Sequence, residues 1–224
     1  MAKLLVYDTE KRHIEVFEDF AEGAAMPYNQ GGTLTLREFR GASKSQTLWT
    51  SVQCMQHWNH LRRNYGKPIT VRYAFRRIWE GGHGTRSQHY AGLALDMGQG
   101  HSQSQRTEMR TIAQNSGLWG YVEPAHMTPS WVHVDRRYGV RSGYPTLRNG
   151  DNGVYVMLLQ DALSNLGYVT GSFITGVFDT QTEIALRSYQ GKTGLAADGI
   201  CGSVTWKNIS TAAKGMGRKA SAID

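Results

Sequence analysis

Two histidines and an aspartate in this sequence have the residue types of metal ligands, and a second aspartate follows the last histidine. His89 and Asp96 lie in the stretch SQHYAGLALDMG, and His133 and Asp135 lie about forty residues further on in SWVHVD. Catalytic zinc needs about three imidazole or carboxylate ligands and an open position for water, whose pKa it lowers toward 7. A surface loop or a buried hydrogen bond would explain the same spacing, and the helical His-Glu-x-x-His motif is absent.

Short strands are the elements that would position these side chains. Residues 93–97 read as a strand with Asp96 on the face opposite Leu95 and Met97. By the same two-residue period, residues 131–135 form a strand whose face carries His133 and Asp135. Ligands on adjacent rigid strands would keep a fixed geometry.

The remaining patterns of the first 145 residues alternate between strand and helix. The two-residue alternation in ITVRYAF predicts a half-buried strand. Predicted elsewhere are two strands in 3–17 around the turn 8–12, a helix over 45–64 ended by Gly66, a flexible loop over 80–88 and a helix over about 103–116 capped by Gly117.

The pattern of residues changes at the turn-rich linker 144–153, and only helical patterns follow this linker. A stripe of apolar residues runs from Val154 to Leu166, TQTE at 180–183 reads as a capping box, and Trp206 marks a third helix. We therefore expect an α+β domain over 1–145, a small helical domain over 146–213 and a flexible tail over 214–224.

Composition limits the classes of protein that fit. The 224 residues carry a formal net charge of +7, which suits an anionic partner, but no basic helix or long Lys/Arg run favours nucleic acid. Two distant cysteines, Cys54 and Cys201, are expected to be buried thiols, although a single bridge between them is an alternative. No window is apolar enough for a membrane span, and no signal-peptide pattern opens the sequence, so we expect cytosolic synthesis.

Beyond spacing, the first half carries a family resemblance. SQHYAGLALD matches Ser-x-His-x-x-Gly-x-Ala-x-Asp and resembles the signature of the zinc D,D-carboxypeptidase/endopeptidase family, which shares its fold with the hedgehog signalling domain. WVHVD resembles its second signature, and LTLREF and GKPITVRYAFR are also similar, so the resemblance covers about residues 33–139. It implies a small central antiparallel sheet with flanking helices, one zinc ion on His89, Asp96 and His133, and cleavage of peptide bonds in peptidoglycan stems.

The resemblance also suggests residues that bind substrate. It implies that Arg76, in preference to its neighbour Arg77, holds a substrate carboxylate or carbonyl, which a guanidinium fork does well. Ser87 either bonds near the substrate or a ligand, or caps its loop.

The sequence offers three candidates for the general base. Relatives place a Glu three residues before the last His ligand, where this chain has Ser130. We rank Asp135 first, then Glu123, then His126; Asp135 is alternatively an acceptor that fixes a ligand tautomer. The other histidines are interpreted as surface or helix residues: His57, His60, His83 and His101.

The second half resembles the peptidoglycan-binding domain 1 family over 151–210. The matching features are Leu159-Gln160, the exit Leu166–Tyr168, the turn Gly176–Thr182, Tyr189-Gln190 and the ending DGICGSVTW. The resemblance implies three helices and non-covalent anchoring on the cell wall, with the apolar positions serving as core.

Both halves point to one substrate, although they were interpreted separately. The leading hypothesis is a zinc-dependent peptidoglycan peptidase (D,D- or L,D-, carboxypeptidase or endopeptidase) anchored to the wall by its C-terminal domain. The alternative, favoured by Ser130, is a non-catalytic wall-binding protein with a degenerate peptidase domain. We expect a monomer without nucleic-acid partners or membrane insertion, acting as an endolysin does after phage, prophage or mother-cell lysis.

Overall fold

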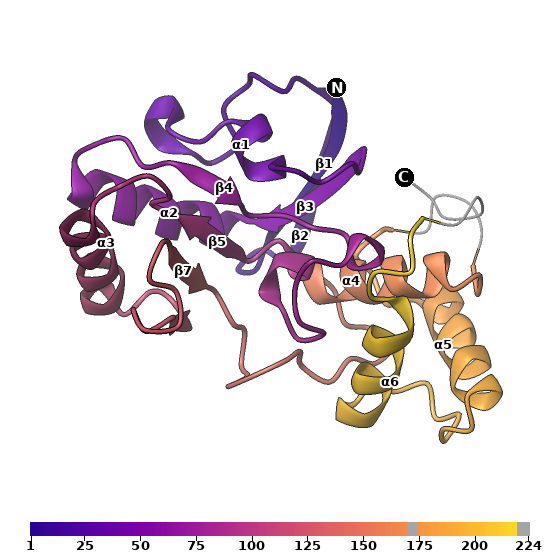
Figure 1. Cartoon of the computed structure of the whole chain (residues 1–224). Helices are drawn as coiled ribbons and strands as arrows, with labels where there is room; N and C mark the ends of the chain where they lie inside the picture. The colour runs from indigo at the N-terminus through magenta and orange to yellow at the C-terminus, as the bar shows by residue number, and fades with distance from the viewer. Residues whose placement is uncertain (170–173, 219–224) are drawn as a thin grey trace.

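The fold is mixed α+β, with two small sheets in the N-terminal part and three helices in the C-terminal part (Figure 1). It is seen in a computed structural model that describes residues 1–169 and 174–218. The strands are β1 (Ala2–Asp8), β2 (His13–Phe20), β3 (Thr47–Ser51), β4 (Val71–Tyr73), β5 (Ala94–Met97), β6 (Tyr121–Val122) and β7 (Val132–Asp135). The α-helices are α1 (Leu36–Arg40), α2 (Val52–Tyr65), α3 (Gln103–Ser116), α4 (Val154–Asn165), α5 (Thr180–Lys192) and α6 (Ser203–Ala213). Three short 3-10 helices are η1 (Gln30–Gly32), η2 (Ile78–Glu80) and η3 (Gln88–Ala91).

The antiparallel sheet that carries the candidate ligands has the strand order β4-β5-β7-β6. Its register pairs Asp96 with His133 and Ala94 with Asp135 across β5 and β7. Strand β4 is shorter than the alternation in ITVRYAF predicts, because a register shift lies between Val71 and Tyr73. The predicted alternation therefore stops there, and Tyr73 is exposed.

A second sheet, β2-β1-β3, corrects the prediction for residues 45–64. The two N-terminal strands were predicted, but residues 47–51 form β3, parallel to β1, and only 52–65 are helical. All five residues of β3 are buried, so the strand has no alternating pattern, and its apolar spacing also fits a helix.

Helix α3 follows its prediction closely, whereas α5 begins differently from its prediction. Ser102 caps the start of α3 and Gly117, at φ 64°, ends it, and Met109 and Ala113 face inward. The predicted capping box in TQTE is not formed, because the preceding Asp179 is the N-cap and accepts from the Thr182 amide at 2.8 Å.

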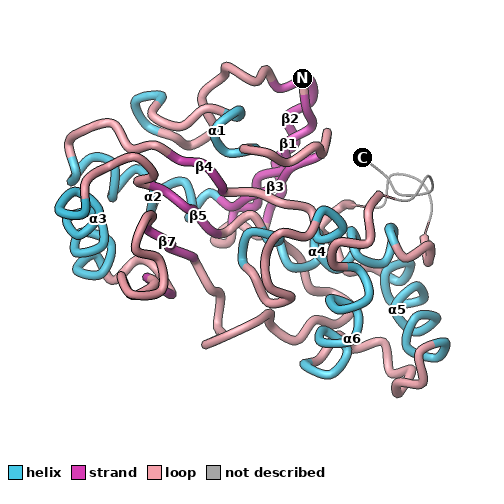
Figure 2. Tube along the Cα trace, viewed as in Figure 1, coloured by secondary structure: helices cyan, strands magenta, loops and turns pink. Residues whose placement is uncertain are grey.

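Helix α4 joins the two parts of the molecule. All twelve of its residues are buried, and it contacts α5 and α6 of the C-terminal part as well as β3, η2 and η3 of the N-terminal part. Arg77, which is fully buried, donates to Asp161 of α4 at 2.7 Å. The three C-terminal helices gather at one end of the molecule, away from α3 (Figure 2).

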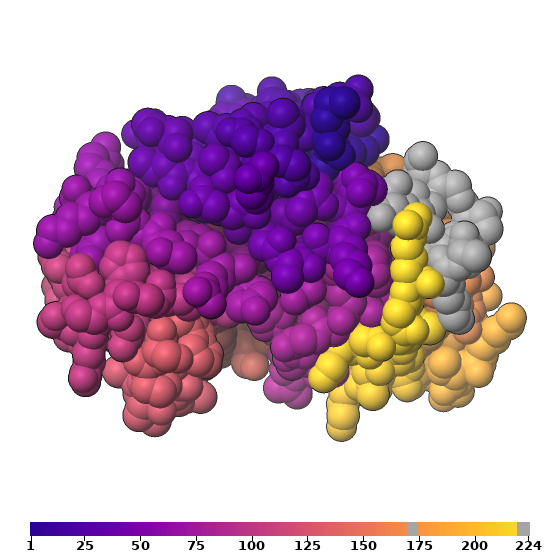
Figure 3. All heavy atoms as spheres, turned by 45° about the horizontal axis from the view of Figure 1, so that its top comes forward, coloured from indigo at the N-terminus to yellow at the C-terminus, as the bar shows by residue number. Residues whose placement is uncertain are grey.

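The segment after α6 also contacts the N-terminal part. Gly215 and Gly217 donate backbone hydrogen bonds to Ile78 and Trp79, each at 3.0 Å. Figure 3 shows this yellow segment lying against magenta residues of the first part. Residues 219–224 of the predicted tail lie outside the described residues.

Two further expectations concern the core and the membrane. Cys54 and Cys201 are buried free thiols, as predicted. Within residues 1–169 and 174–218, no helix combines the length and apolar character that a membrane crossing requires.

Candidate metal centre

Asp96 lies between two histidines at the middle of the four-stranded sheet. Because β5 and β7 pair Asp96 with His133, Asp96 Oδ1 lies within hydrogen-bond distance of His133 Nδ1, at 2.7 Å. Its other oxygen, Oδ2, lies 3.4 Å from His89 Nε2. The three residues predicted as zinc ligands are therefore brought together.

A short turn and a close backbone contact orient His89. Ser87 caps η3 by accepting from the His89 amide at 3.3 Å, so this serine has the loop-capping role considered above. At the other end, Gly92 has φ 67°, and a Cβ there would lie 1.9 Å from the Trp49 carbonyl oxygen. Only glycine lets the turn approach β3 this closely.

The ring of His89 offers a lone pair to the centre. Its Nδ1 lies 3.1 Å from the Ala74 carbonyl oxygen, which can only accept, so Nδ1 carries the hydrogen. In the neutral imidazole Nε2 then holds the lone pair, and this atom is buried and has no hydrogen-bond partner. A lone pair facing a carboxylate oxygen is repulsive unless a cation lies between them, so the arrangement fits a metal ion.

His133 is fixed from both sides. Its Nε2 faces Asp135 Oδ2 at 3.2 Å, and Arg137 binds both oxygens of Asp135, at 2.7 and 2.9 Å. Burial alone would lower the pKa of His133, but hydrogen bonds to Asp135 and Asp96 outweigh it and raise the pKa to about 9. If Nε2–H is retained toward Asp135, Nδ1 becomes free to bind a metal beside Asp96.

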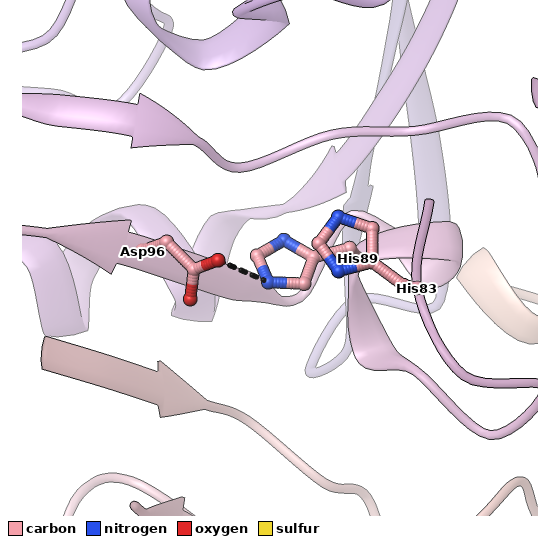
Figure 4. A group of neighbouring side chains, drawn as sticks. All are labelled: His83, His89 and Asp96. Atoms are coloured by element: carbon pink, nitrogen blue, oxygen red, sulfur yellow. Dashed lines mark ion pairs between the residues drawn. The ribbon is translucent and has the colours of Figure 1, made fainter. Parts of the chain in front are cut away.

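A fourth donor, His83, contradicts its interpretation as a surface or helix residue. Its ring stacks on that of His89 with 4.2 Å between centroids, and burial lowers its pKa to about 3. Ligand atoms of His83, His89 and Asp96 all lie within 4.8 Å of one another (Figure 4). No periodic pattern marks His83, because this residue lies in a glycine-rich loop and reaches His89 only through the tertiary fold.

These side chains border a cleft of about 280 Å³, here called the histidine cleft. It is lined by His83, Gly84, Arg86, Ser87, His89, Asp96, Glu123, Trp131 and His133. Of the predicted bases, Glu123 therefore faces the candidate ligands. Asp135 instead lies beneath His133 with 2% of its side chain exposed, and His126 is exposed on the surface.

The segment that carries Glu123 is held by a buried arginine that the sequence did not single out. The Glu123 amide donates to the His133 carbonyl at 3.0 Å, which continues the pairing of β6 with β7. Arg110 of α3 donates to the carbonyl oxygens of Glu123, Thr128 and Trp131. In the sequence, only its position next to the inward-facing Met109 indicated that Arg110 could be buried.

A second hollow of about 490 Å³ adjoins the histidine cleft and shares His83, Asp96 and Trp131 with it. Arg76 and Arg72 line this second hollow. Arg77 lies elsewhere, against α4, so of the two adjacent arginines it is Arg76 that faces the site.

Comparison with known proteins agrees with both halves of this architecture. Residues 32–135 match the family model described as Peptidase M15, and residues 152–209 match that of a putative peptidoglycan binding domain. The chain thus carries a region similar to M15 peptidases, followed by a region similar to a peptidoglycan-binding domain. The M15 match contains the candidate ligands on both strands.

Individual relatives cover smaller parts. The chain is 44% identical over 73 residues to the N-acetylmuramoyl-L-alanine amidase CwlM of Mycobacterium tuberculosis (strain ATCC 25618 / H37Rv), which is 33% of this chain and 18% of that protein. It is 35% identical over 71 residues to an uncharacterized protein in the bpoA1 3′ region of Kitasatospora aureofaciens, covering 32% of this chain and 60% of that one. The chain thus spans less than two thirds of either curated relative.

Two solved structures are also similar over about a third of the chain. The SleB N-terminal domain is 37% identical, with 31% of this chain and 94% of that chain covered and a TM-score of 0.30. A peptidoglycan-binding protein from Clostridioides difficile, in complex with glutamine hydroxamate, is 33% identical, with 34% and 48% covered and a TM-score of 0.31.

Proposed function

We propose that this protein is a zinc-dependent peptidase that hydrolyses peptide bonds in peptidoglycan stems. The observation that carries the proposal is the buried His89 Nε2, which lacks a hydrogen-bond partner and faces Asp96 in an open cleft. The M15 match over the same residues supports a hydrolase, and the peptidoglycan-binding match supports the wall as its substrate.

The ligands we propose are His89, Asp96 and His133. When bound, a zinc ion would supply Lewis-acid activation of water and of the substrate carbonyl. His133 is preferred over His83 as the third ligand, because Asp135 and Arg137 already hold its outer nitrogen in the way that metal-bound histidines are usually held.

Glu123 is the group we propose as general base. A base must reach the proton that it removes, and Glu123 borders the same cleft as the ligands. Asp135, which the sequence ranked first, has both oxygens bound by Arg137, so it suits the alternative role of fixing the His133 tautomer.

Arg76 and Arg72 give the adjoining hollow its charge. Two guanidinium groups beside the candidate metal suit a carboxylate of the stem peptide. This arrangement supports the substrate-binding role proposed for Arg76. It leaves carboxypeptidase and endopeptidase action as two forms of the same proposal, because carboxylates occur at stem termini and on side chains.

A wall-binding protein without turnover is the second candidate. One observation favours it: Ser130, which is exposed, stands where relatives of the resembling family place a glutamate. On this alternative the histidine cleft would bind metal or stem peptide without cleaving it.

The test is mass spectrometry of purified sacculi after incubation with the protein, with and without a chelator. New amine and carboxyl ends on stem peptides, lost in the chelator, are expected and would identify the bond that is cut. Pelleting of the protein on sacculi without new ends would contradict the peptidase and favour the binding-only candidate.

A further inference from the structure

A polar hollow of about 260 Å³ lies between the two domains. One side comes from the loop that follows η2, with Thr85 and Arg86, and the other from α6, with Lys207 and Ser210. Figure 1 shows α6 beside this loop. We call this space the inter-domain hollow.

Shared residues make the inter-domain hollow part of a longer track. Arg86 lines both the histidine cleft and the inter-domain hollow. Lys207 and Thr211 line both the inter-domain hollow and a further hollow of about 440 Å³ on the outer face of α6. The three spaces therefore follow one another from the candidate metal centre across the domain boundary, as an extended polymer would require.

The inner wall of the inter-domain hollow is formed by packed aromatic rings, and it is hydrogen-bonded to the turn that carries His89. The rings of Tyr144 and Trp206 lie 4.8 Å apart, and Trp206 Nε1 donates to the Pro145 carbonyl at 2.7 Å. The Tyr144 hydroxyl donates to the carbonyl oxygen of Ser87, the residue that caps the His89 turn, at 2.9 Å. A ligand seated here would be in fixed register with the histidine cleft.

One polar group in this wall points to a ligand. Ser210 is 1% exposed, yet its hydroxyl has no hydrogen-bond partner. Leaving a buried hydroxyl unbonded is unfavourable, so an unexplained case in a lined hollow indicates a partner that binds there. The exposed cations Arg86 and Lys207 at the rim favour an anion.

We propose that the inter-domain hollow binds a second stem peptide of the same peptidoglycan strand, with Ser210 bonding the peptide and Arg86 and Lys207 attracting its carboxylates. The ligand class rests on the proposed function. The site is distinct from the position of bond cleavage, and it makes the two domains one binding surface.

The test measures pelleting of the intact protein on sacculi that have been stripped of other anionic polymers, with a chelator present so that turnover does not interfere. Ser210→Ala removes the unpartnered hydroxyl and should leave the midpoint of unfolding unchanged or higher, while weakening sacculus binding about fivefold. Lys207→Glu should weaken sacculus binding further than Ser210→Ala does. Lys192→Glu on α5 makes the same charge change at an exposed position outside the track and should bind as the unmodified protein does.

Equal binding by Ser210→Ala, Lys207→Glu and Lys192→Glu would overturn the proposal, as would an equal loss in both lysine variants with none in Ser210→Ala. Loss of all pelleting by the unmodified protein on stripped sacculi would also overturn it, because the ligand would then be another anionic polymer. The proposed function is judged separately, by new stem-peptide ends without chelator. If those ends appear while the variants still bind normally, only the inter-domain site fails.

Discussion

The lone pair of each histidine decides what the centre can hold. His89 presents Nε2 because Ala74 occupies Nδ1, and His133 presents Nδ1 if Asp135 keeps Nε2. His83 has no comparable polar anchor on its ring in the described contacts, which are stacking and edge contacts with neighbouring rings. For this reason we propose His89 and His133 as metal ligands and regard His83 as a ring that packs beside them.

His133→Ala and His83→Ala should therefore differ in zinc affinity. Loss of a ligand is expected to abolish stoichiometric zinc after dialysis, whereas loss of a ring that only packs on His89 should weaken binding by about tenfold or less. Zinc content by elemental analysis, together with competition against a chromogenic chelator, measures both. Retention of zinc by His133→Ala with loss in His83→Ala would move the third ligand to His83.

Glu123→Gln tests the proposed base. The change keeps size and polarity but removes proton acceptance, so turnover on sacculi should fall by about 10²- to 10⁴-fold with zinc content unchanged. Asp135→Asn is the comparison: it should lower zinc affinity by about 10- to 100-fold through His133, and activity should return with added zinc. A zinc-loaded Asp135→Asn protein without turnover would assign the base to Asp135 instead.

Single residues also show where sequence reasoning was sufficient. The family resemblance implied that His89, Asp96 and His133 would meet, and the pairing of β5 with β7 places Asp96 opposite His133. It could not rank Glu123 above Asp135, because that order depends on Arg137, whose fork binds Asp135 only in the folded protein. Two residues that contact the site through the tertiary fold, His83 and Arg110, were missed for the same reason.

Elements were predictable where a local signal marks their ends. Helix α3 has a capping serine before it and a left-handed glycine after it, and its bounds follow. Strand β3 has no such signal, because its stability comes from parallel pairing with β1, some forty residues earlier in the chain. Strand β6 has only two residues, too few for a pattern.

The close contact of the η3 turn with β3 makes a prediction at this scale. Gly92→Ala would place a Cβ 1.9 Å from the Trp49 carbonyl oxygen, in a left-handed backbone. We expect the free energy of unfolding to fall by about 3 kcal/mol or more, from backbone strain and overpacking together. Urea unfolding followed by tryptophan fluorescence measures it.

Gly100→Ala is the matched control for Gly92→Ala. Gly100 also has a positive φ, 84°, but a Cβ there meets nothing within 4 Å. It should therefore show only the cost of the left-handed backbone, about 1 kcal/mol. If both variants lose the same stability, the contact with β3 contributes nothing and the orientation of His89 has another origin.

In the whole molecule, the C-terminal domain packs on the N-terminal domain through α4. Besides the Arg77–Asp161 pair, the Tyr7 hydroxyl donates to Asn152 Oδ1 at 2.5 Å. The amides of Gly215 and Gly217 donate to carbonyl oxygens of η2. Contacts at both ends of the C-terminal domain fix its orientation. A wall strand bound by this domain, as proposed, would then meet the histidine cleft at one set angle, with Arg86 lining both that cleft and the inter-domain hollow.

Removing the carboxylate of Asp161 should show how much the contact between the two domains stabilises the folded protein. Asp161→Ala removes the carboxylate that the fully buried guanidinium of Arg77 contacts at 2.7 Å, so the free energy of unfolding should fall by about 3–5 kcal/mol in urea titrations. Glu18→Ala, which breaks the exposed pair with Lys3, should cost less than about 1 kcal/mol. Replacing both buried partners, Arg77→Met with Asp161→Leu, should recover much of the loss, because no buried charge remains. An Asp161→Ala variant as stable as Glu18→Ala would mean that apolar packing of α4 alone holds the two domains together.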